Sequence, residues 1–583
     1  MLTTNPLRRS YLGKLWFLTA LALYLLLTGY QAGLPGLHYD EAREAGLNAL
    51  ELLTGAPVTA FRHVTLPFFG WHLPVMVQDY IGALNVYLAM PVLWLTGIGV
   101  PNLRLVPILI GLATLLLLER TVTAWMAWRN GQPSAARLPL SLAGLLAVTL
   151  LVASPSFVFW SRQGIFVTNL TQPLTLWALW QGIRWLHSGQ QRALLWSAFA
   201  GGCALYAKLL ALWVIGPFVL LAAGWWLWQR WQRRAVAPLS FPLFLGTIVV
   251  FLLPLTPLLF FNWQSGGVWR ALTEHLDTSY YGVANRDLLA NLVVRSRQVV
   301  QTLEGRHFWY LGGLYDNPVA PWLALVSIGW GLWRCHRLIL GPLLLGLAAF
   351  ACSLFTISDL FITHYALLHP LFTGIVALGL TVIGIATNPD AASTIFREGG
   401  SGRSGQQDGA SQKMIQSSAA LPVDRWRWLL ALLIALWFGV DLTATARYHL
   451  ALTSSGGLGD HSDVSYHLAY HLRYNGLGAP IALDWGFDAP VRYLSEGAVT
   501  PIEIFGYSSP AAPDPAFGER LRPFLGNPNN VYLLHTPAAT SFQGRRETFF
   551  AEVAHAGRQA RLETTFAQRD GVPLVELWRV GPP

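Results

Sequence analysis

Charged residues are scarce in this chain. They make up only 12% of its 583 residues, whereas they make up about 25% of an average soluble protein. Hydrophobic residues make up 53%, and long apolar runs recur from one end of the sequence to the other. A soluble globular protein is therefore excluded. The composition predicts a polytopic α-helical membrane protein.

Cysteine is also rare. The three cysteines, Cys203, Cys335 and Cys352, lie in apolar surroundings, and none belongs to a Cys-x-x-Cys pair. The sequence therefore indicates neither a disulfide framework nor a structural zinc site.

The net charge of +9 does not indicate a nucleic-acid partner. The basic residues stand in short clusters between apolar runs, as the positive-inside rule for cytoplasmic loops predicts. Arg8, Arg9 and Lys14 come at the start of the first apolar run, 11–30, and no small-residue cleavage site follows it. We expect an uncleaved first helix with a cytoplasmic N-terminus, in a plasma (inner) membrane.

The apolar runs and the arginine clusters between them predict about eleven transmembrane helices. Two apolar stretches flank GVPNLR within 81–123. The charge rule allows only one net crossing there, so the other stretch is expected at the membrane interface. The remaining crossings are expected at 11–30, 139–160, 165–186, 194–208, 210–228, 241–261, 320–333, 338–355, 365–385 and 428–446.

The loops define the expected domains. The transmembrane core spans 1–386 and carries two large extracytoplasmic loops, 31–80 and 262–318. A segment rich in Gly, Ser and Gln, 387–427, is typical of a flexible cytoplasmic linker. It leads to the last transmembrane helix, 428–446.

The tail, 447–583, has a different character. PIALDWGF, NVYLLHT and LVELWRV are typical of strands, and DAPVRYLSEG and RETFFAEVAHAG of helices. We expect a small extracytoplasmic α/β domain with a core of its own. In the first loop, DEAREAGLNALELL predicts an amphipathic helix that lies on the membrane surface.

Asp40 and Glu41 come shortly after the first helix, in GLHYDEAREAG. One interpretation is structural, because acids near a helix N-terminus offset the helix dipole. The other is functional. In a loop tethered by helices at both ends, a carboxylate can act as a general base toward a hydroxyl or amine, or help hold a divalent cation. The same loop offers four further candidates for substrate contacts: Arg62, His63, His72 and Asp79.

Lys208 is one of only three lysines, with Lys14 and Lys413, and it interrupts a long apolar run. A cation at such a depth is costly and is a functional candidate by default. The alternative is a lysine at the turn between two helices, with its amine reaching back to water. The expected topology puts this turn on the same face as Asp40, where a point charge suits a phosphate.

Three more candidates are expected on that face. Arg162 lies in a tight helix connection, FVFWSRQGIFVTN, and arginine binds phosphate through paired hydrogen bonds. His364 and Tyr365 open a late helix in SDLFITHYALLHP. Taken alone, Arg162 is equally consistent with a helix-end charge at the membrane interface, and a lone histidine is usually just a polar loop residue. Taken together, the charges predict a substrate with an anionic head and a lipid tail.

The order of these motifs resembles that of membrane glycosyltransferases with the C-type fold. More narrowly, it resembles glycosyltransferase family 39, the protein O-mannosyltransferase and aminoarabinose transferase group. HYDEA resembles the family's acidic pair, FWSRQGIFVTNLTQPLTLWAL its Ser-Arg element, and GGCALYAKLLAL the helix pair that bears a lysine. HFWYLGGLYDNPVAPW resembles an aromatic loop before a Pro-Trp, and HYALLHPLFTGIVALGL a late helix that opens on a tyrosine.

The resemblance implies an enzyme that takes a sugar from a polyprenyl phosphate in the bilayer. The sugar passes to an extracytoplasmic acceptor, which is a protein, a glycolipid or an envelope glycan, usually with inversion. Asp40 becomes the catalytic base and Glu41 its partner. Around the donor phosphate the resemblance implies four residues: Lys208, Arg162, His364 and Tyr365.

Two features depart from the family pattern. The acid that often follows the Ser-Arg element is replaced by Thr168 and Asn169. The first loop reads RHVTLPFFGWHLP and lacks the Lys-Pro-Pro of the aminoarabinose branch. This second difference argues against an aminoarabinose substrate and a lipid A acceptor.

Two other functions stay open. A transporter or flippase for lipids or lipid-linked sugars would also place charges among helices, but it is expected to show inverted repeats, which we do not find in the sequence. A non-catalytic envelope scaffold would bind through its tail. No cofactor is established by the sequence, and a divalent cation stays an option. One cluster in the tail is interpreted as a solvated connector and not as a metal site: Asp460, His461, Asp463 and His467.

Overall fold

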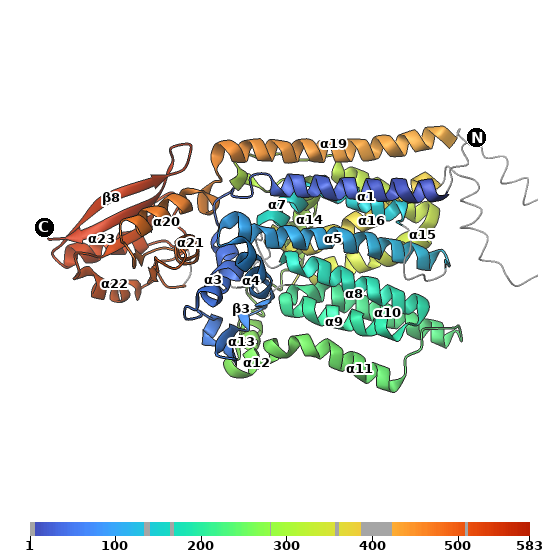
Figure 1. Cartoon of the computed structure of the whole chain (residues 1–583), viewed down its shortest axis with the longest axis horizontal. Helices are drawn as coiled ribbons and strands as arrows, with labels where there is room; N and C mark the ends of the chain where they lie inside the picture. The colour runs from blue at the N-terminus through green and yellow to red at the C-terminus, as the bar shows by residue number, and fades with distance from the viewer. Residues whose placement is uncertain are drawn as a thin grey trace, which may run out of the picture.

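The computed structural model describes residues 6–132, 140–163, 168–279, 282–355, 361–385, 423–507 and 511–582. The described part of the chain is elongated. A bundle of long helices forms one end and a smaller domain with a β-sheet forms the other (Figure 1). The expected class, a polytopic helical membrane protein with a C-terminal α/β domain, is confirmed. Of the expected linker, only 423–427 lie within the described residues.

Six described helical segments are long and apolar enough to cross a membrane. They are α1 (Pro6–Gly29), α5 (Val100–Arg129), α10 (Leu212–Trp231), α11 with α12 (Phe241–Leu252 and Thr256–Ser265), α15 (Ala320–Cys352) and α19 (Val423–Ser455). A seventh is formed if α6 (Leu142–Ala153) and α7 (Pro155–Gln163), bent by 69°, count as one span.

The expected number of about eleven crossings also includes helices that fall short of that length or apolar content. These are α8 (Thr168–Ser188), α9 (Gln191–Ala207) and α16 (His369–Ile385). Between α4 (Leu84–Thr96) and α5, only α5 is long enough to cross. This agrees with the single crossing that the charge rule allowed there.

Helix α15 is broken at Cys335, where the backbone leaves the helical region (φ −149°, ψ 59°). A Cβ atom placed on Gly331 would lie only 2.7 Å from Cγ1 of Ile339. A straight helix cannot bring these positions together, because eight residues rise by about 12 Å. The chain therefore turns sharply here, between the two crossings expected at 320–333 and 338–355.

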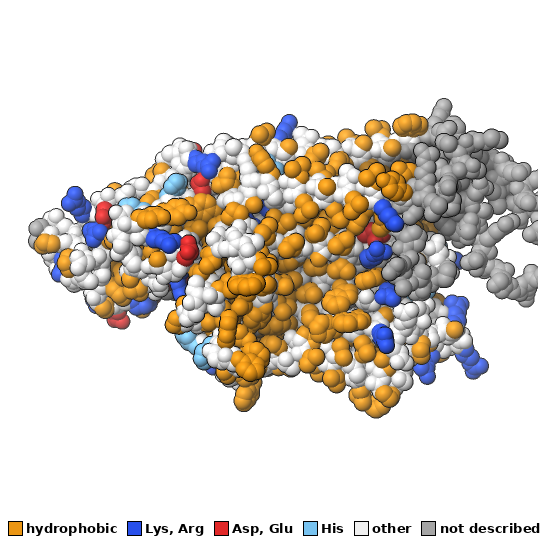
Figure 2. Space-filling view, viewed as in Figure 1, with side chains coloured by type: hydrophobic (Ala, Val, Ile, Leu, Met, Phe, Trp, Pro, Cys, Tyr) orange, Lys and Arg blue, Asp and Glu red, His pale blue; other side chains and the backbone are white. Residues whose placement is uncertain are grey.

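The outer surface of the bundle is apolar. Leu220 of α10 and Val249 of α11 are exposed, and hydrophobic side chains cover the middle of the bundle (Figure 2). Lys and Arg side chains gather at the end away from the sheet (Figure 2). Inside the bundle, Leu115, Leu146 and Ile375 belong to one buried apolar cluster. Such a belt suits hydrocarbon, where helices satisfy all their own backbone hydrogen bonds.

The first loop folds into short elements at the sheet end of the bundle (Figure 1). They are α2 (Tyr39–Glu41), the π-helix η1 (Ala42–Gly46), α3 (Leu47–Thr54), η2 (Phe61–His63), the antiparallel strands β1 (Thr65–Phe68) and β2 (Trp71–Pro74), β3 (Met76–Gln78) and β4 (Ile81–Gly82). The expected helix is present, but Ala42, Glu44, Leu47 and Leu50 are all buried. It packs between α4 and the C-terminal domain, so its expected place on the membrane surface is wrong.

Short helices complete the bundle. They are η3 (Leu209–Ala211), η4 (Leu253–Leu255), α13 (Gly267–Glu274), α14 (Leu288–Glu304), η5 (Trp309–Leu311) and η6 (Ile362–Leu367).

The C-terminal domain contains a five-stranded mixed sheet in the order β6-β5-β7-β9-β8. Strand β5 (Ile481–Ala482) is parallel to β6 (Ile502–Glu503) and β7 (Val531–His535), and β9 (Pro573–Gly581) is antiparallel to β7 and β8 (Gln559–Ala567). The helices are η8 (Gly459–His461), α20 (Val464–Tyr474), α21 (Asp488–Leu494), α22 (Phe517–Leu525) and α23 (Arg545–His555). All three expected strands and both expected helices are present.

The C-terminal domain docks directly on the first loop. Arg492 of α21 forms an ion pair with the buried Glu51 at 2.8 Å. The hydroxyl of Tyr466 in α20 donates to the carbonyl of Gly33 at 2.7 Å. The loop is therefore held between the bundle and the sheet domain, which fixes the position of Asp40.

Candidate active site

Asp40 lies in the first turn of α2, directly after α1 and the segment that follows it. His38 lies directly before this turn, with its Nδ1 3.2 Å from the backbone nitrogen of Asp40. The Asp40 side chain is 23% exposed, whereas that of His38 is only 6% exposed. A substrate can therefore reach the carboxylate while its support is buried.

Burial raises the pKa of Asp40, and the positive charges of His38 and Lys208 act against that rise. A carboxylate with a raised pKa is a better proton acceptor, and neighbouring cations help it stay ionised. The fold thus brings Asp40 and Lys208 within electrostatic reach, although they lie far apart in the sequence.

Lys208 lies where the chain leaves α9. Its backbone is extended (φ −159°, ψ 131°) and forms a β-bridge with Ile81, at the end of the first loop. The side chain is only 2% exposed, and Nζ donates to Oγ1 of Thr168 at 3.2 Å. Its charge also acts on Asp40 and Glu44. The amine is therefore held inside the protein, and the alternative of a lysine that reaches back to water is wrong.

His364 and Tyr365 are both buried in η6. Burial, followed by the charges of Lys208 and Arg295, holds the pKa of His364 well below its usual range. This imidazole is therefore neutral and close to Lys208. The hydroxyl of Tyr365 lies 3.1 Å from Oγ of Ser353, so it is already engaged in a hydrogen bond.

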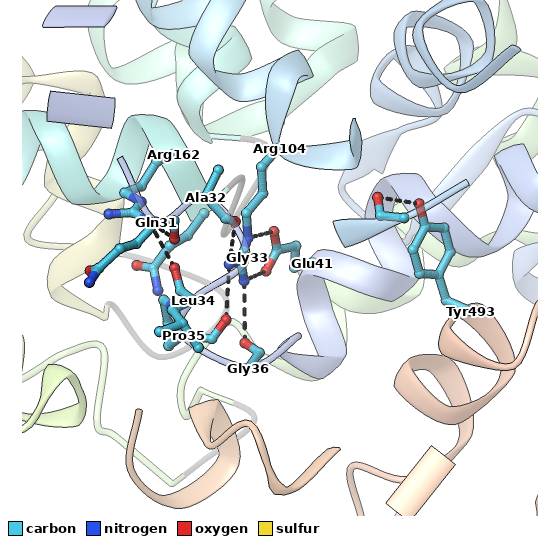
Figure 3. Close-up of polar contacts among 12 residues, drawn as sticks. Gln31, Ala32, Gly33, Leu34, Pro35, Gly36, Glu41, Arg104, Arg162 and Tyr493 are labelled. Atoms are coloured by element: carbon cyan, nitrogen blue, oxygen red, sulfur yellow. Dashed lines mark hydrogen bonds and ion pairs between the residues drawn. The ribbon is translucent and has the colours of Figure 1, made fainter. Parts of the chain in front are cut away.

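Glu41 belongs to a buried ion pair. Arg104 of α5 donates from Nε and Nη2 to the two carboxylate oxygens at 2.7 and 2.9 Å, and neither side chain is more than 3% exposed. The same guanidinium also donates to the carbonyls of Ala32, Pro35 and Gly36 (Figure 3). Arg104 therefore fixes the path of the chain from α1 to Asp40.

Arg162 supports the same stretch from the other side (Figure 3). Its Nη2 donates to the carbonyls of Gln31 and, at 2.9 Å, of Leu34, and its Nη1 lies 3.3 Å from Nδ1 of His449. The side chain is fully buried. Most of its donors are thus committed to protein groups.

The four other candidates of the first loop lie nearer its surface. Arg62 donates to both carboxylate oxygens of Asp79 at 2.7 and 2.8 Å, so these two neutralise each other. His63 and His72 are exposed. Nδ1 of His72 lies 3.5 Å from Oγ1 of Thr65 across the β1–β2 hairpin.

Sequence reasoning missed His38 and underrated Asp460. Nε2 of His38 lies 3.2 Å from Oδ2 of Asp460, at the start of the C-terminal domain. His461 stacks on His38 with ring centroids 4.3 Å apart. The ligand atoms of these three residues lie within 4.8 Å of one another. Two stacked rings cannot both aim a lone pair at one ion without turning, so the geometry fits a hydrogen-bonded pair of His38 and Asp460 beside a stacked ring better than a metal centre.

No family model matches the sequence, and no curated protein matches it. Solved structures of similar fold include two of ArnT. ArnT from Cupriavidus metallidurans bound to undecaprenyl phosphate has a TM-score of 0.53 at 12% identity. The apo state of ArnT from the same organism has a TM-score of 0.52 at 13% identity. In both cases the likeness covers 97% of each chain.

The fold is similar to the C-type membrane glycosyltransferase fold of ArnT. Because the likeness covers 97% of both chains, the C-terminal domain is part of it and not an addition to it. At 12% identity the comparison concerns the fold alone. The narrower assignment to family 39 stays a prediction.

Proposed function

We propose that this protein is a membrane glycosyltransferase that moves a sugar from a polyprenyl-phosphate donor to an acceptor on the extracytoplasmic face. The observation that carries this proposal is the approach of a partly exposed carboxylate, Asp40, to a buried lysine, Lys208, at the sheet end of the bundle. The carboxylate suits the removal of a proton from the acceptor, and the lysine suits the negative charge of the departing phosphate.

The proposed reaction is a single displacement. The hydroxyl oxygen of the acceptor attacks the anomeric carbon of the sugar while the bond from that carbon to the phosphate oxygen breaks. Asp40 takes the hydroxyl proton, and the bonding electrons leave with the polyprenyl phosphate. One base suffices, and no covalent intermediate forms on the protein.

Lys208 would stabilise the charge that develops on the leaving phosphate. A preorganised cation in a water-poor site acts strongly because it needs no reorganisation during the reaction. The neutral His364 lies near this lysine and can donate a hydrogen bond to the same phosphate. Tyr365 shapes the wall beside it. Undecaprenyl phosphate is the lipid bound in one ArnT structure, which supports a donor of this class.

Glu41 and Arg162 have positioning roles in this proposal. The pair of Glu41 with Arg104, and the bonds of Arg162 to the carbonyls of Gln31 and Leu34, hold the chain that leads into α2. Asp40 is thereby held in place through its backbone. The first-loop residues Arg62, His63, His72 and Asp79 are proposed to lie along the path of the acceptor, and no metal ion is required by the steps above.

A transfer assay tests the proposal. The full-length protein is reconstituted in liposomes with radiolabelled polyprenyl-phosphate sugars as donors and cell-envelope extract as the acceptor pool. Wild type should form labelled product, and Asp40→Asn should form at least about 100-fold less. Asp277→Asn is the matched control, because Asp277 is an exposed loop carboxylate. Movement of lipid-linked sugar across the bilayer, without transfer by the wild type, would instead favour a flippase.

A further inference from the structure

A large cavity lies inside the bundle, away from Asp40. Its volume is about 440 Å³, and its walls come from α5, α8, α10, α15 and α16. Binding pockets for small molecules range from about 300 to about 1,000 Å³. The walls are mostly apolar, with Phe218, Trp225 and Leu345 among them. The cavity therefore suits a hydrocarbon chain and not a sugar.

The cavity extends along α5 toward the end of the bundle opposite the sheet domain. Its lining on α5 runs from Leu118 to Arg129, a rise of about 16 Å. The other end of α5 touches the C-terminal domain, where the hydroxyl of Tyr493 donates to the carbonyl of Gly99 (Figure 3). Because α5 is 30 residues long, the Arg129 end lies about 45 Å from that contact.

Two arginines stand at this end of the cavity. Nε of Arg129 donates to the carbonyl of Arg337 at 3.1 Å, just after the break in α15. Trp125 and Trp128 flank the Arg129 guanidinium at 5.8 and 5.9 Å. Within the part of the chain that the structure describes, neither arginine has a carboxylate partner. Two positive charges therefore meet at the mouth of an apolar cavity without an internal counter-charge.

We propose that this cavity binds an acyl chain of an anionic phospholipid, whose phosphate bridges Arg129 and Arg337. An acyl chain fits the apolar walls, and a phosphate supplies the missing counter-charge. Basic pockets between transmembrane helices bind anionic lipid head groups in this way. The tryptophans fit as well, because indole rings favour the interface where head group and chain meet. The bound lipid would join the end of α5 to the turn in α15.

The proposed donor lipid is a different ligand at the opposite end of the molecule. Its phosphate belongs near Lys208, whereas Arg129 and Arg337 are separated from that site by the length of the bundle. Lipid binding in this cavity can therefore be tested independently of the sugar-transfer reaction.

Lipid binding to the purified, delipidated full-length protein can be measured by native mass spectrometry. Phosphatidylglycerol is titrated beside phosphatidylcholine with the same acyl chains. Wild type should bind phosphatidylglycerol more tightly than phosphatidylcholine. Arg337→Gln should weaken that binding about fivefold, and the double change with Arg129→Gln about 25-fold, because each arginine near a lipid surface contributes about a fivefold factor.

Matched variants separate the two parts of the site. Arg334→Gln removes an arginine of the same turn that stacks on Trp333 at 4.3 Å and does not line the cavity, so it should leave binding unchanged. Ala222→Phe fills the cavity and should abolish binding, whereas Ala223→Phe, on the exposed side of α10, should not. Unfolding temperatures confirm that each variant is folded.

Three outcomes would overturn the proposal. Equal affinity for the two lipids would show that charge plays no part. Unchanged affinity in Arg337→Gln and Ala222→Phe would place the lipid elsewhere. Displacement of phosphatidylglycerol by inorganic phosphate alone would show that no acyl chain is needed.

Discussion

His38 is bound to Asp460 across the junction between the first loop and the C-terminal domain, with Nε2 and Oδ2 3.2 Å apart. Burial acts to lower the pKa of His38, but the hydrogen bond and the charge of Asp460, with those of Asp40 and Glu41, raise it to about 9. The ring is therefore charged at neutral pH. Nδ1 of this ring lies 3.9 Å from Oδ2 of Asp40, which links the C-terminal domain to the proposed base.

The first prediction concerns the pH profile of His38→Gln. The charge of His38 acts to lower the pKa of Asp40, so its removal raises that pKa. A base works only when deprotonated, and the acid limb of kcat/KM should therefore move to higher pH. The profile is measured by transfer assays between about pH 4 and about pH 8, the range over which a perturbed carboxylate titrates. His467→Gln, which changes an exposed histidine of α20, is the control. An unmoved acid limb in His38→Gln would contradict the electrostatic link between His38 and Asp40.

The second prediction concerns stability. The folded pKa of His38 is about 9, against about 6.5 in an unfolded chain. Its charged form therefore stabilises the fold fully below about pH 6.5, and this contribution, on the order of 3 kcal/mol, is lost as the pH rises through 9. In Asp460→Asn, the unfolding temperature should therefore fall less steeply than in wild type as the pH rises from about 6.5 to about 9. If the unfolding temperatures of wild type and variant changed in parallel with pH, the pair of His38 and Asp460 would make no such contribution to stability.

The third prediction separates Glu41 from Asp40. Glu41→Gln leaves the buried charge of Arg104 without its partner, which typically costs about 3–5 kcal/mol. The unfolding temperature should fall sharply. Asp79→Asn, which breaks the more exposed pair with Arg62, should cost about 1 kcal/mol or less. If Glu41→Gln lost transfer while its unfolding temperature stayed unchanged, Glu41 would have a direct part in the chemistry.

The fourth prediction concerns Lys208. Lys208→Gln should lower kcat by about 100-fold to about 1,000-fold, as does the loss of one preorganised group that stabilises transition-state charge. Lys208→Arg keeps the charge and should recover part of the loss. Single-turnover transfer with saturating donor measures this effect. A raised KM with an unchanged kcat would assign the lysine to ground-state binding instead.

The lengths of the apolar runs sufficed to predict a polytopic helical membrane protein. The scarcity of lysine was enough to single out Lys208. Both signals are local, since a run of about 20 apolar residues and a cation within it need no knowledge of distant contacts. Strand β8 escaped prediction for a physical reason. Most of its side chains are exposed, so Gln559–Ala567 at the edge of the sheet shows no apolar alternation.

The partners of the charged groups could not be predicted, because they come from distant parts of the chain. Nothing near Glu41 in the sequence indicates that Arg104 will form an ion pair with it. Likewise, nothing near Arg162 indicates that it will donate to the carbonyls of Gln31 and Leu34. Asp460 was visible in an acidic, histidine-rich cluster. Its partner His38 was not, because the contact exists only once the domain has docked.

The central claim is that Asp40 accepts the proton of the acceptor hydroxyl. The most direct measurement compares Asp40→Asn with wild type in two assays on the same reconstituted protein, donor binding and single-turnover transfer. The account predicts unchanged donor binding and a loss of transfer of about 100-fold to about 10,000-fold, the usual contribution of a general base. Transfer at the wild-type rate by a folded Asp40→Asn would contradict it.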